Sequence, residues 1–242
     1  MEYRLGKLYA IGVGPGDPEL LTIKAIKILK NVSNIFSVTS SSESKSTAFD
    51  IVSSYINSNC KCTQLYFPMT KDETLLKKAW NKNALEVYKA LRIGRDAAFI
   101  TLGDPSIYST YSYLWQYLYT IDKHIEVEVI PGITSFQAAS ARLNIPLVTG
   151  DESLTILTGV NGSKRLEEIF PISDNIVIMK VYKHWKEIFD FLSKQNNIKI
   201  ASLISRCGLK GEKIWEDIRN INLEQPPSYF TLSIVKKTLD EK

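Results

Sequence analysis

The stretch that decides the fold is Lys7-Leu8-Tyr9-Ala10-Ile11-Gly12-Val13-Gly14-Pro15-Gly16-Asp17-Pro18. Its mostly apolar part, up to Val13, predicts a buried strand, and the glycines and prolines after it predict a tight turn. From Thr22 to Lys30, apolar side chains recur at helical spacing. A buried strand that turns directly into a helix is typical of α/β folds with a parallel sheet.

The rest of the chain repeats this alternation. Strands are expected over residues 35–38, 63–67, 97–102, 127–130, 154–157, 176–179, 198–204 and 229–235. Helices are expected over residues 48–56, 74–91, 108–119, 164–170 and 185–194. In the first half this pattern predicts a parallel sheet covered on both faces. We expect two α/β domains, 1–120 and 121–242, each a sheet flanked by helices, with a ligand cleft between them.

Composition excludes several classes of protein. The chain has 242 residues, 44% of them hydrophobic, which is enough for a packed core. Its net charge of +4 comes without a dense basic run, which argues against a nucleic-acid partner. No apolar stretch approaches the roughly 18 residues that span a bilayer. The first residues lack the apolar core of a signal peptide, so we expect a cytoplasmic protein without a membrane partner.

The cysteines and histidines do not form a recognisable metal motif. Cys60 and Cys62 are separated by one residue, and we expect them on opposite faces of a strand, which is unsuited to zinc. The histidines, His124 and His184, are expected at the surface or in satisfied hydrogen bonds. We therefore expect no metal site in the protein.

The glycine-rich turn after the first strand does not match a dinucleotide-binding loop. Such a loop needs glycine at the position of Asp17, and Pro15 removes a backbone donor that phosphates would use. Two interpretations of this turn remain open. In the first, its backbone closely approaches a ligand. In the second, it only joins the strand to a helix, with Asp17 as the helix cap and Pro18 at the first helical position.

Two more turns follow buried strands. The second is Gly103-Asp104-Pro105-Ser106-Ile107-Tyr108, and the third is Pro131-Gly132-Ile133-Thr134-Ser135. Asp104 either caps a helix or accepts hydrogen bonds from a ribose and attracts a cationic group. Thr134 with Gln137 fits a reciprocal helix cap. Because open α/β folds bind ligands at the carboxyl ends of strands, the three turns, two in the first domain and one in the second, together indicate a cleft between the domains.

With these turns the sequence resembles the tetrapyrrole (corrin/porphyrin) methylase family, from about Lys7 to the last strand. The stretch 101–111 looks most like the branch that methylates C20 of precorrin-2 or cobalt-factor II. The stretches 143–147, 150–152, 177–182 and 206–214 support that branch, although Lys210 stands where the branch often has proline. The siroheme-forming methylases usually carry phenylalanine and further glycines where this chain has Ile107 to Thr110.

The resemblance implies the two-domain tetrapyrrole methylase fold, a homodimer in the cytoplasm, and S-adenosylmethionine as methyl donor in the cleft. The residues that it implies as contacts of this cofactor are Pro15, Gly103, Asp104, Ile107, Tyr108, Thr134, Ser135 and Met179. The tetrapyrrole carries several carboxylates, and the basic residues near the motifs are Arg142, Lys180, Lys183 and Arg206. Each of these four is either a substrate contact or ordinary surface charge. The sequence names no catalytic base.

Three questions stay open at this point. Another enzyme of the superfamily, such as a C11 or uroporphyrinogen methylase or diphthine synthase, would share the cofactor site. A non-catalytic tetrapyrrole-binding protein would need no cofactor. Within cobalamin biosynthesis, the substrate is either metal-free precorrin-2 or cobalt-factor II, and the abundance of Lys, Asn and Ile leans towards the cobalt form.

Overall fold

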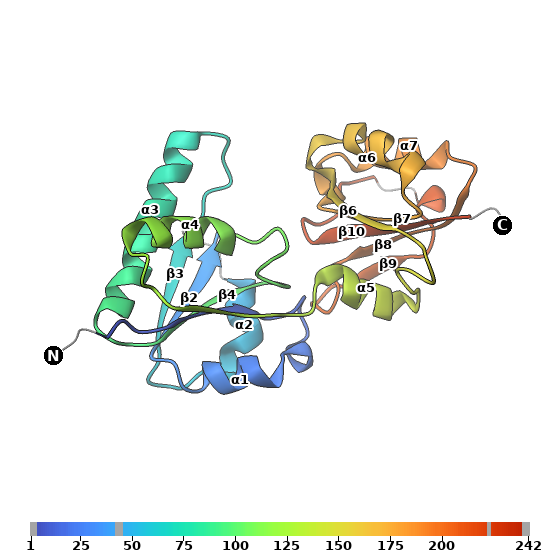
Figure 1. Ribbon diagram of the computed structural model, residues 1–242. Coiled ribbons are helices and arrows are strands. Elements are labelled where there is room, and N and C mark those ends of the chain that lie inside the picture. Colours follow the sequence, from blue (N-terminus) through green and yellow to red (C-terminus); the bar gives the residue numbers. More distant parts are fainter. Residues whose placement is uncertain (1–3, 42–45, 222–223, 239–242) are drawn as a thin grey trace. The chain divides into compact units, whose positions relative to one another are not determined.

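The computed structural model describes residues 4–41, 46–221 and 224–238 (Figure 1). The chain divides into two units, Met1–Thr134 and Ser135–Lys242. Each unit holds a five-stranded sheet with helices on it, which confirms the expected pair of α/β domains. Among the described residues, no helix is both long enough and apolar enough to cross a membrane.

The first unit is built on a parallel sheet with the strand order β3-β2-β4-β1-β5. Its elements are β1 (Leu8–Gly12), a 3-10 turn (Pro18–Leu20), α1 (Ile23–Leu29), β2 (Asn34–Thr39), α2 (Thr47–Val52), β3 (Lys61–Tyr66), α3 (Glu73–Arg92), β4 (Ala97–Thr101), α4 (Tyr111–Ile121) and β5 (Val127–Ile130). Along β4, Phe99 packs with α3 and α4, and Ile100 packs with α1 and α2. Both faces are therefore covered, as the unbroken apolar strands predict (Figure 1).

The boundary between the units lies later than residue 120, where we expected it. β5 pairs with β1, from Leu8 beside Val127 to Ile11 beside Ile130, so it completes the first sheet. The first unit consequently runs to Thr134. A pattern of strands and helices shows that a strand exists, but it does not show which sheet the strand joins.

The helix expected from Tyr108 begins at Tyr111 instead. Tyr108 has a φ of 48°, a left-handed backbone conformation that a right-handed helix excludes. The first helical N–H group, that of Tyr111, donates to the Ser109 hydroxyl at 3.1 Å, and the Ser109 and Thr101 hydroxyls hydrogen-bond at 3.0 Å. Residues 103–110 are therefore a loop that is fastened to the end of β4.

The second unit has a mixed sheet with the order β6-β7-β10-β8-β9. Its elements are α5 (Ser135–Leu143), β6 (Leu154–Thr158), α6 (Lys164–Ile169), β7 (Asn175–Met179), α7 (Trp185–Ser193), β8 (Ile198–Ser205), β9 (Lys213–Trp215) and β10 (Thr231–Lys237). Only β6 and β7 are parallel neighbours. Helices α6 and α7 cover one face, where Ile188 and Leu192 meet the core, and α5 lies on the other (Figure 1). The short strand β9 was not expected from the sequence.

A buried lysine fastens the loop between α5 and β6 to this sheet. Lys236 on β10 is 8% exposed, and its ammonium donates to the carbonyls of Pro146 and Leu147 at 3.0 and 3.2 Å. Its third partner is the Glu152 carboxylate at 3.1 Å, which also accepts from Asn175. These three acceptors use all three N–H groups of the ammonium. Burial alone would raise the pKa of Glu152, but these hydrogen bonds outweigh it and lower the pKa to about 2.

Replacing Lys236 by methionine should lower the free energy of unfolding by about 3 kcal/mol, because it leaves the largely buried Glu152 carboxylate without its cation. Chemical denaturation at pH 7 measures this loss. Lys194→Met is the matched control, since the Lys194–Asp190 pair is exposed and contributes less than about 1 kcal/mol. Because the pKa of Glu152 is lowered on folding, the wild-type advantage should hold above about pH 4.5 and fade towards pH 2. Equal losses in the two variants would contradict this account.

Candidate functional site

The three turns identified in the sequence meet at the carboxyl edge of the first sheet. β1 lies between β4 and β5, with Gly12 beside Thr101 and Ile11 beside Ile130. The first and second turns are hydrogen-bonded to each other, since the Gly103 N–H donates to the Gly14 carbonyl at 2.8 Å and the Gly14 N–H donates back at 3.3 Å. Turns that lie far apart in the sequence therefore form one continuous backbone surface.

Glycines make this close contact possible. A Cβ atom at Gly12 would lie 2.5 Å from the Gly103 carbonyl oxygen and 2.7 Å from the Gly132 nitrogen. A Cβ atom at Gly132 would meet the same carbonyl oxygen even more closely and would lie 2.7 Å from the Gly12 carbonyl carbon. The backbones of the three turns can approach to this degree only without side chains at these positions.

The Asp104 carboxylate joins the second turn to the third. One oxygen accepts from the Gly132 N–H at 2.9 Å, and the other accepts from the Ser106 N–H at 2.8 Å and from the Ser106 hydroxyl. Asp104 is 9% exposed, and burial would raise its pKa, but these hydrogen bonds outweigh burial and hold the pKa below its ordinary value. Asp104 does not cap α4, which begins only at Tyr111. Asp104 is therefore an ionised, buried side chain that holds the second and third turns together beside the sheet edge.

The Asp17 junction fits the capping interpretation. Its carboxylate accepts from the Glu19 N–H at 2.9 Å, and Pro18 opens the 3-10 turn Pro18–Leu20. Thr22 then caps α1 by accepting from the Ala25 N–H at 3.2 Å. Capping therefore explains Asp17, while the adjacent Gly14 and Pro15 remain part of the surface at the sheet edge.

Six of the residues implied as cofactor contacts lie in the first unit at this edge, namely Pro15, Gly103, Asp104, Ile107, Tyr108 and Thr134. Pro15 and Thr134 are buried, whereas Tyr108 is 53% exposed. The left-handed φ of Tyr108 is unusual for an aromatic residue, and backbone strain of this kind concentrates at functional sites. Sequence reasoning missed the packing role of Gly12 and Gly132, although both belong to the quoted turns.

The second unit has an edge of its own where predicted residues gather. β7 ends at Met179, next to the start of β10 at Leu232, and β8 ends at Ser205 opposite Thr231. Lys180 and Arg206 follow these two strand ends with φ values of 56° and 57°. Two non-glycine residues in left-handed conformations thus flank β10 at one edge of the sheet.

Two tyrosines that the sequence analysis did not single out line the same edge. The rings of Tyr182 and Tyr229 meet edge to face with their centroids 5.2 Å apart. Burial, with the nearby Tyr182, raises the pKa of Tyr229, and burial lowers the pKa of Lys180. The edge therefore combines cationic and aromatic side chains in a partly desolvated setting.

The four basic residues predicted to bind the substrate differ in the contacts that their side chains make within the protein. The Arg142 guanidinium pairs with Glu212 at 2.7 Å, and the Arg206 Nε atom donates to the Lys210 carbonyl at 2.8 Å. The Lys183 ammonium lies 5.9 Å from the centre of the Tyr182 ring. Lys180, Lys183 and Arg206 thus belong to the tyrosine-lined edge, whereas Arg142 is tied to the loop between β8 and β9.

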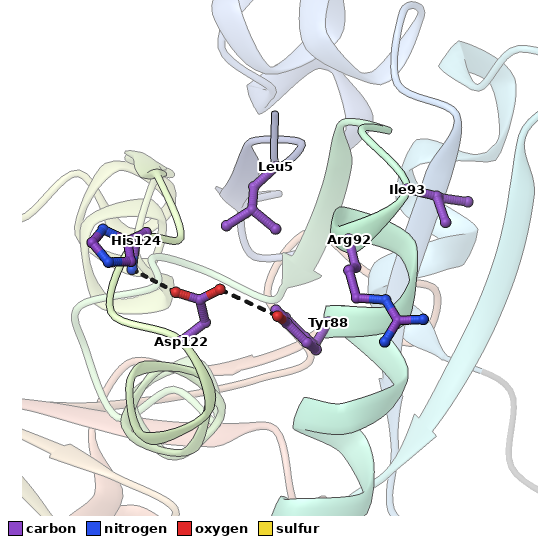
Figure 2. A pocket seen from close by; sticks show the side chains of 6 residues that line it. All are labelled: Leu5, Tyr88, Arg92, Ile93, Asp122 and His124. Carbon is purple, nitrogen blue, oxygen red and sulfur yellow. Dashed lines mark hydrogen bonds between the residues drawn. The ribbon is translucent and has the colours of Figure 1, made fainter. Parts of the chain in front are cut away.

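A separate cavity of about 550 Å³ lies at the opposite, amino edge of the first sheet (Figure 2). Its lining residues are Leu5, Tyr88, Arg92, Ile93, Asp122 and His124. Figure 2 shows Asp122 between the Tyr88 hydroxyl at 3.2 Å and the His124 backbone N–H at 2.9 Å. These residues precede β1, β4 and β5, whereas the three turns follow those strands, so this cavity is distinct from the carboxyl edge.

Comparison with known proteins defines the class. Residues 7–221 match the family Tetrapyrrole (Corrin/Porphyrin) Methylases, and the chain belongs to this family. This confirms the family resemblance carried by the three turns.

Individual relatives are similar over nearly their whole length. The chain is 40% identical, over 96% of each chain, to a probable cobalt-precorrin-2 C(20)-methyltransferase of Methanocaldococcus jannaschii. It is 31% identical to a cobalt-precorrin-2 C(20)-methyltransferase of Salmonella typhimurium, covering 96% of this chain and 97% of that one. A crystal structure of a putative cobalamin-synthesis-related protein of Corynebacterium diphtheriae superimposes with a TM-score of 0.73 at 19% identity, covering 96% and 99% of the two chains. The last similarity confirms the fold.

Proposed function

We propose that the protein transfers a methyl group from S-adenosylmethionine to C20 of a tetrapyrrole in cobalamin biosynthesis, with cobalt-factor II as the favoured substrate. The similarity to C20-methyltransferases over 96% of the chain carries this proposal. The geometry agrees with it, because the three family turns meet at one edge of the first sheet. The alternative substrate is metal-free precorrin-2, because a third relative is a precorrin-2 C(20)-methyltransferase of Sinorhizobium.

The carboxyl edge of the first unit fits a cationic, nucleoside-containing cofactor. The buried, ionised Asp104 places a negative charge there, and glycine backbone leaves room for close approach. Each carboxylate oxygen has two acceptor sites, and the oxygen bonded to Gly132 retains one for a ligand donor. All eight residues that the resemblance implies as contacts of S-adenosylmethionine are part of this proposal. Ser135 and Met179, which belong to the second unit, are included because of the resemblance alone.

The residues present fit a mechanism of alignment. S-adenosylmethionine supplies an already activated methyl group on its sulfonium. Holding two reactants in line contributes roughly 7–11 kcal/mol to rate acceleration, without acid–base catalysis by the protein. The rigid junction of Gly12, Gly103 and Gly132 provides such positioning. We assign no side chain as the base that removes the C20 proton.

The basic residues of the second unit are proposed to bind the carboxylates of the tetrapyrrole. Arg206→Gln and Lys180→Met should each raise KM for the tetrapyrrole roughly tenfold, the equivalent of about 1.4 kcal/mol, with a smaller change in kcat. Arg142→Gln should change KM by less than about twofold, because its guanidinium is already paired with Glu212. Lys183→Met should raise KM for the tetrapyrrole by more than Arg142→Gln does and by less than Arg206→Gln does. Steady-state kinetics measure this, and unchanged KM in all four variants would refute the assignment.

We further propose a homodimer in the cytoplasm. Helix α4 presents exposed aromatic rings, with Tyr113 42% and Tyr119 48% accessible, and Tyr113 stacks on Trp80 with a centroid distance of 4.3 Å. Light scattering of the purified protein should give twice the chain mass of 27.4 kDa. A mass equal to one chain would remove this part of the proposal.

The other candidate functions are separated by two measurements. A non-catalytic tetrapyrrole-binding protein would not bind S-adenosylhomocysteine, whereas the proposed enzyme should bind it in calorimetry. A C11 methylase, a uroporphyrinogen methylase or diphthine synthase would bind it but would act on a different substrate. Assays with cobalt-factor II and with metal-free precorrin-2 side by side should show faster turnover of cobalt-factor II.

A further inference from the structure

The cavity at the amino edge of the first sheet has walls from three parts of the chain that are tied to one another. These parts are the segment before β1, the end of α3 and the turn after α4. The Gly6 N–H donates to the Leu91 carbonyl at 2.8 Å and ties the first part to the second. The Tyr88 hydroxyl donates to the Asp122 carboxylate at 3.2 Å and ties the second part to the third (Figure 2). The volume of about 550 Å³ lies within the roughly 300–1,000 Å³ of small-molecule sites.

Two side chains of opposite charge line this cavity. Arg92 lies four residues after Tyr88 on α3, so both side chains lie on one face of the helix. Among the residues that the structure describes, the Arg92 guanidinium has no hydrogen-bond or ion-pair partner. Each oxygen of the Asp122 carboxylate accepts one hydrogen bond, from Tyr88 or from the His124 N–H, and keeps a second acceptor site. The cavity therefore offers several donors for an anionic group and an acceptor for a cationic one.

Two aliphatic side chains complete the lining. Ile93, which directly follows α3, is 62% exposed, and Leu5 is half-buried. Figure 2 shows Leu5 pointing toward the hydrogen bond between Tyr88 and Asp122. A ligand with an apolar group would remove part of the Leu5 and Ile93 surfaces from water, which favours binding.

The lining argues against several kinds of ligand. Asp122 is the only acidic residue among the described ones that line the cavity, and a divalent cation needs several such oxygen ligands. A phosphate group, with its negative charges, would be repelled by Asp122. A wholly apolar ligand would take the Arg92 guanidinium out of water without giving it a partner. A zwitterion with an apolar group matches both charges and both aliphatic side chains.

We propose that this cavity binds a free α-amino acid with an aliphatic side chain. The carboxylate of the ligand accepts hydrogen bonds from the Arg92 guanidinium, and its ammonium donates to the Asp122 carboxylate. Its side chain packs against Leu5 and Ile93. The three turns lie at the opposite edge of the sheet, so this site is separate from the proposed methyl transfer and does not depend on it.

Titration calorimetry of the full chain with L-leucine tests the site. The wild type should bind one L-leucine with a Kd of about 1 mM or below. Arg92→Gln and Asp122→Asn should each weaken binding at least roughly tenfold, because a charged hydrogen bond to the ligand is lost. Arg95→Gln is the matched control, since Arg95 is exposed and lies three residues further on, outside the lining of the cavity. Circular dichroism confirms that each variant is folded.

Two analogues of leucine assign each charge to its partner. Isocaproate lacks the ammonium, so Asp122→Asn should not weaken its binding, whereas Arg92→Gln should. Isoamylamine lacks the carboxylate and should show the reverse pattern. Saturating S-adenosylhomocysteine should leave the affinity for L-leucine unchanged, which separates this site from the cofactor site. No saturable binding of L-leucine by the wild type, equal affinities of Arg92→Gln and Arg95→Gln, or competition with S-adenosylhomocysteine would overturn the proposal.

Discussion

Replacing Gly132 by alanine will abolish cofactor binding and destabilise the first unit by at least about 3 kcal/mol. The new Cβ atom would lie 2.7 Å from the Gly12 carbonyl carbon and closer still to the Gly103 carbonyl oxygen. Both neighbours are backbone atoms of packed turns, so neither can move aside cheaply. For a chain of this size, the loss corresponds to a fall of about 6–12 °C in the melting temperature, measured by calorimetry.

Gly150→Ala is the matched control for this effect. Gly150 has a left-handed backbone, with a φ of 54°, and apart from its own chain neighbours no atom lies within 4 Å of its would-be Cβ. It should therefore lose only about 1–2 kcal/mol from backbone strain and should keep its affinity for S-adenosylhomocysteine. If Gly132→Ala bound the cofactor product as tightly as Gly150→Ala, the close junction of the three turns would not be needed for binding.

Replacing Asp104 by asparagine should reduce affinity for S-adenosylmethionine at least roughly tenfold and destabilise the protein by about 1.5–3 kcal/mol. Asparagine has nearly the same shape, and one oxygen can still accept from the Gly132 N–H. Its NH₂ group, however, would face the Ser106 N–H, which is also a donor. The negative charge beside the sheet edge is lost as well. Calorimetry with S-adenosylmethionine and denaturation curves measure the two effects.

Ser106→Ala removes the hydroxyl that donates to Asp104 but keeps the carboxylate. This variant therefore tests the effect of one hydrogen bond separately from the effect of the negative charge. It should lower cofactor affinity less than Asp104→Asn does. Folding lowers the pKa of Asp104, so its contribution to stability is complete above the ordinary aspartate range and is lost as pH falls through the lowered value. Asp104→Asn should lack this acid-dependent loss. Identical acid-unfolding profiles for the two variants would contradict the role of the charge.

The sequence predicted the parts of the site that depend on local chemistry. Apolar strands followed by glycine and proline identified all three turns, and Asp17 and Pro18 form the expected capped junction. The sequence predicted the first two turns in one domain and the third in the other; because β5 pairs with β1, the third turn instead lies at the same edge of the first sheet. The resemblance added the family, which the match over residues 7–221 confirms.

Features that depend on tertiary contacts were not predictable in this way. The pairing of β5 with β1 sets the unit boundary, and the left-handed Tyr108 delays the start of α4 to Tyr111, three residues later than expected. The interaction of Asp104 with Gly132 spans 28 residues and has no local signal.

The central claim is methyl transfer to C20, and one labelling experiment tests it most directly. The protein is incubated with S-adenosylmethionine carrying a ¹³C-methyl group and with cobalt-factor II, and the product is examined by mass spectrometry and ¹³C NMR. We predict a single added methyl group whose carbon is attached to C20. A label at another ring position, or an unlabelled tetrapyrrole despite binding of S-adenosylhomocysteine, would contradict the proposed function.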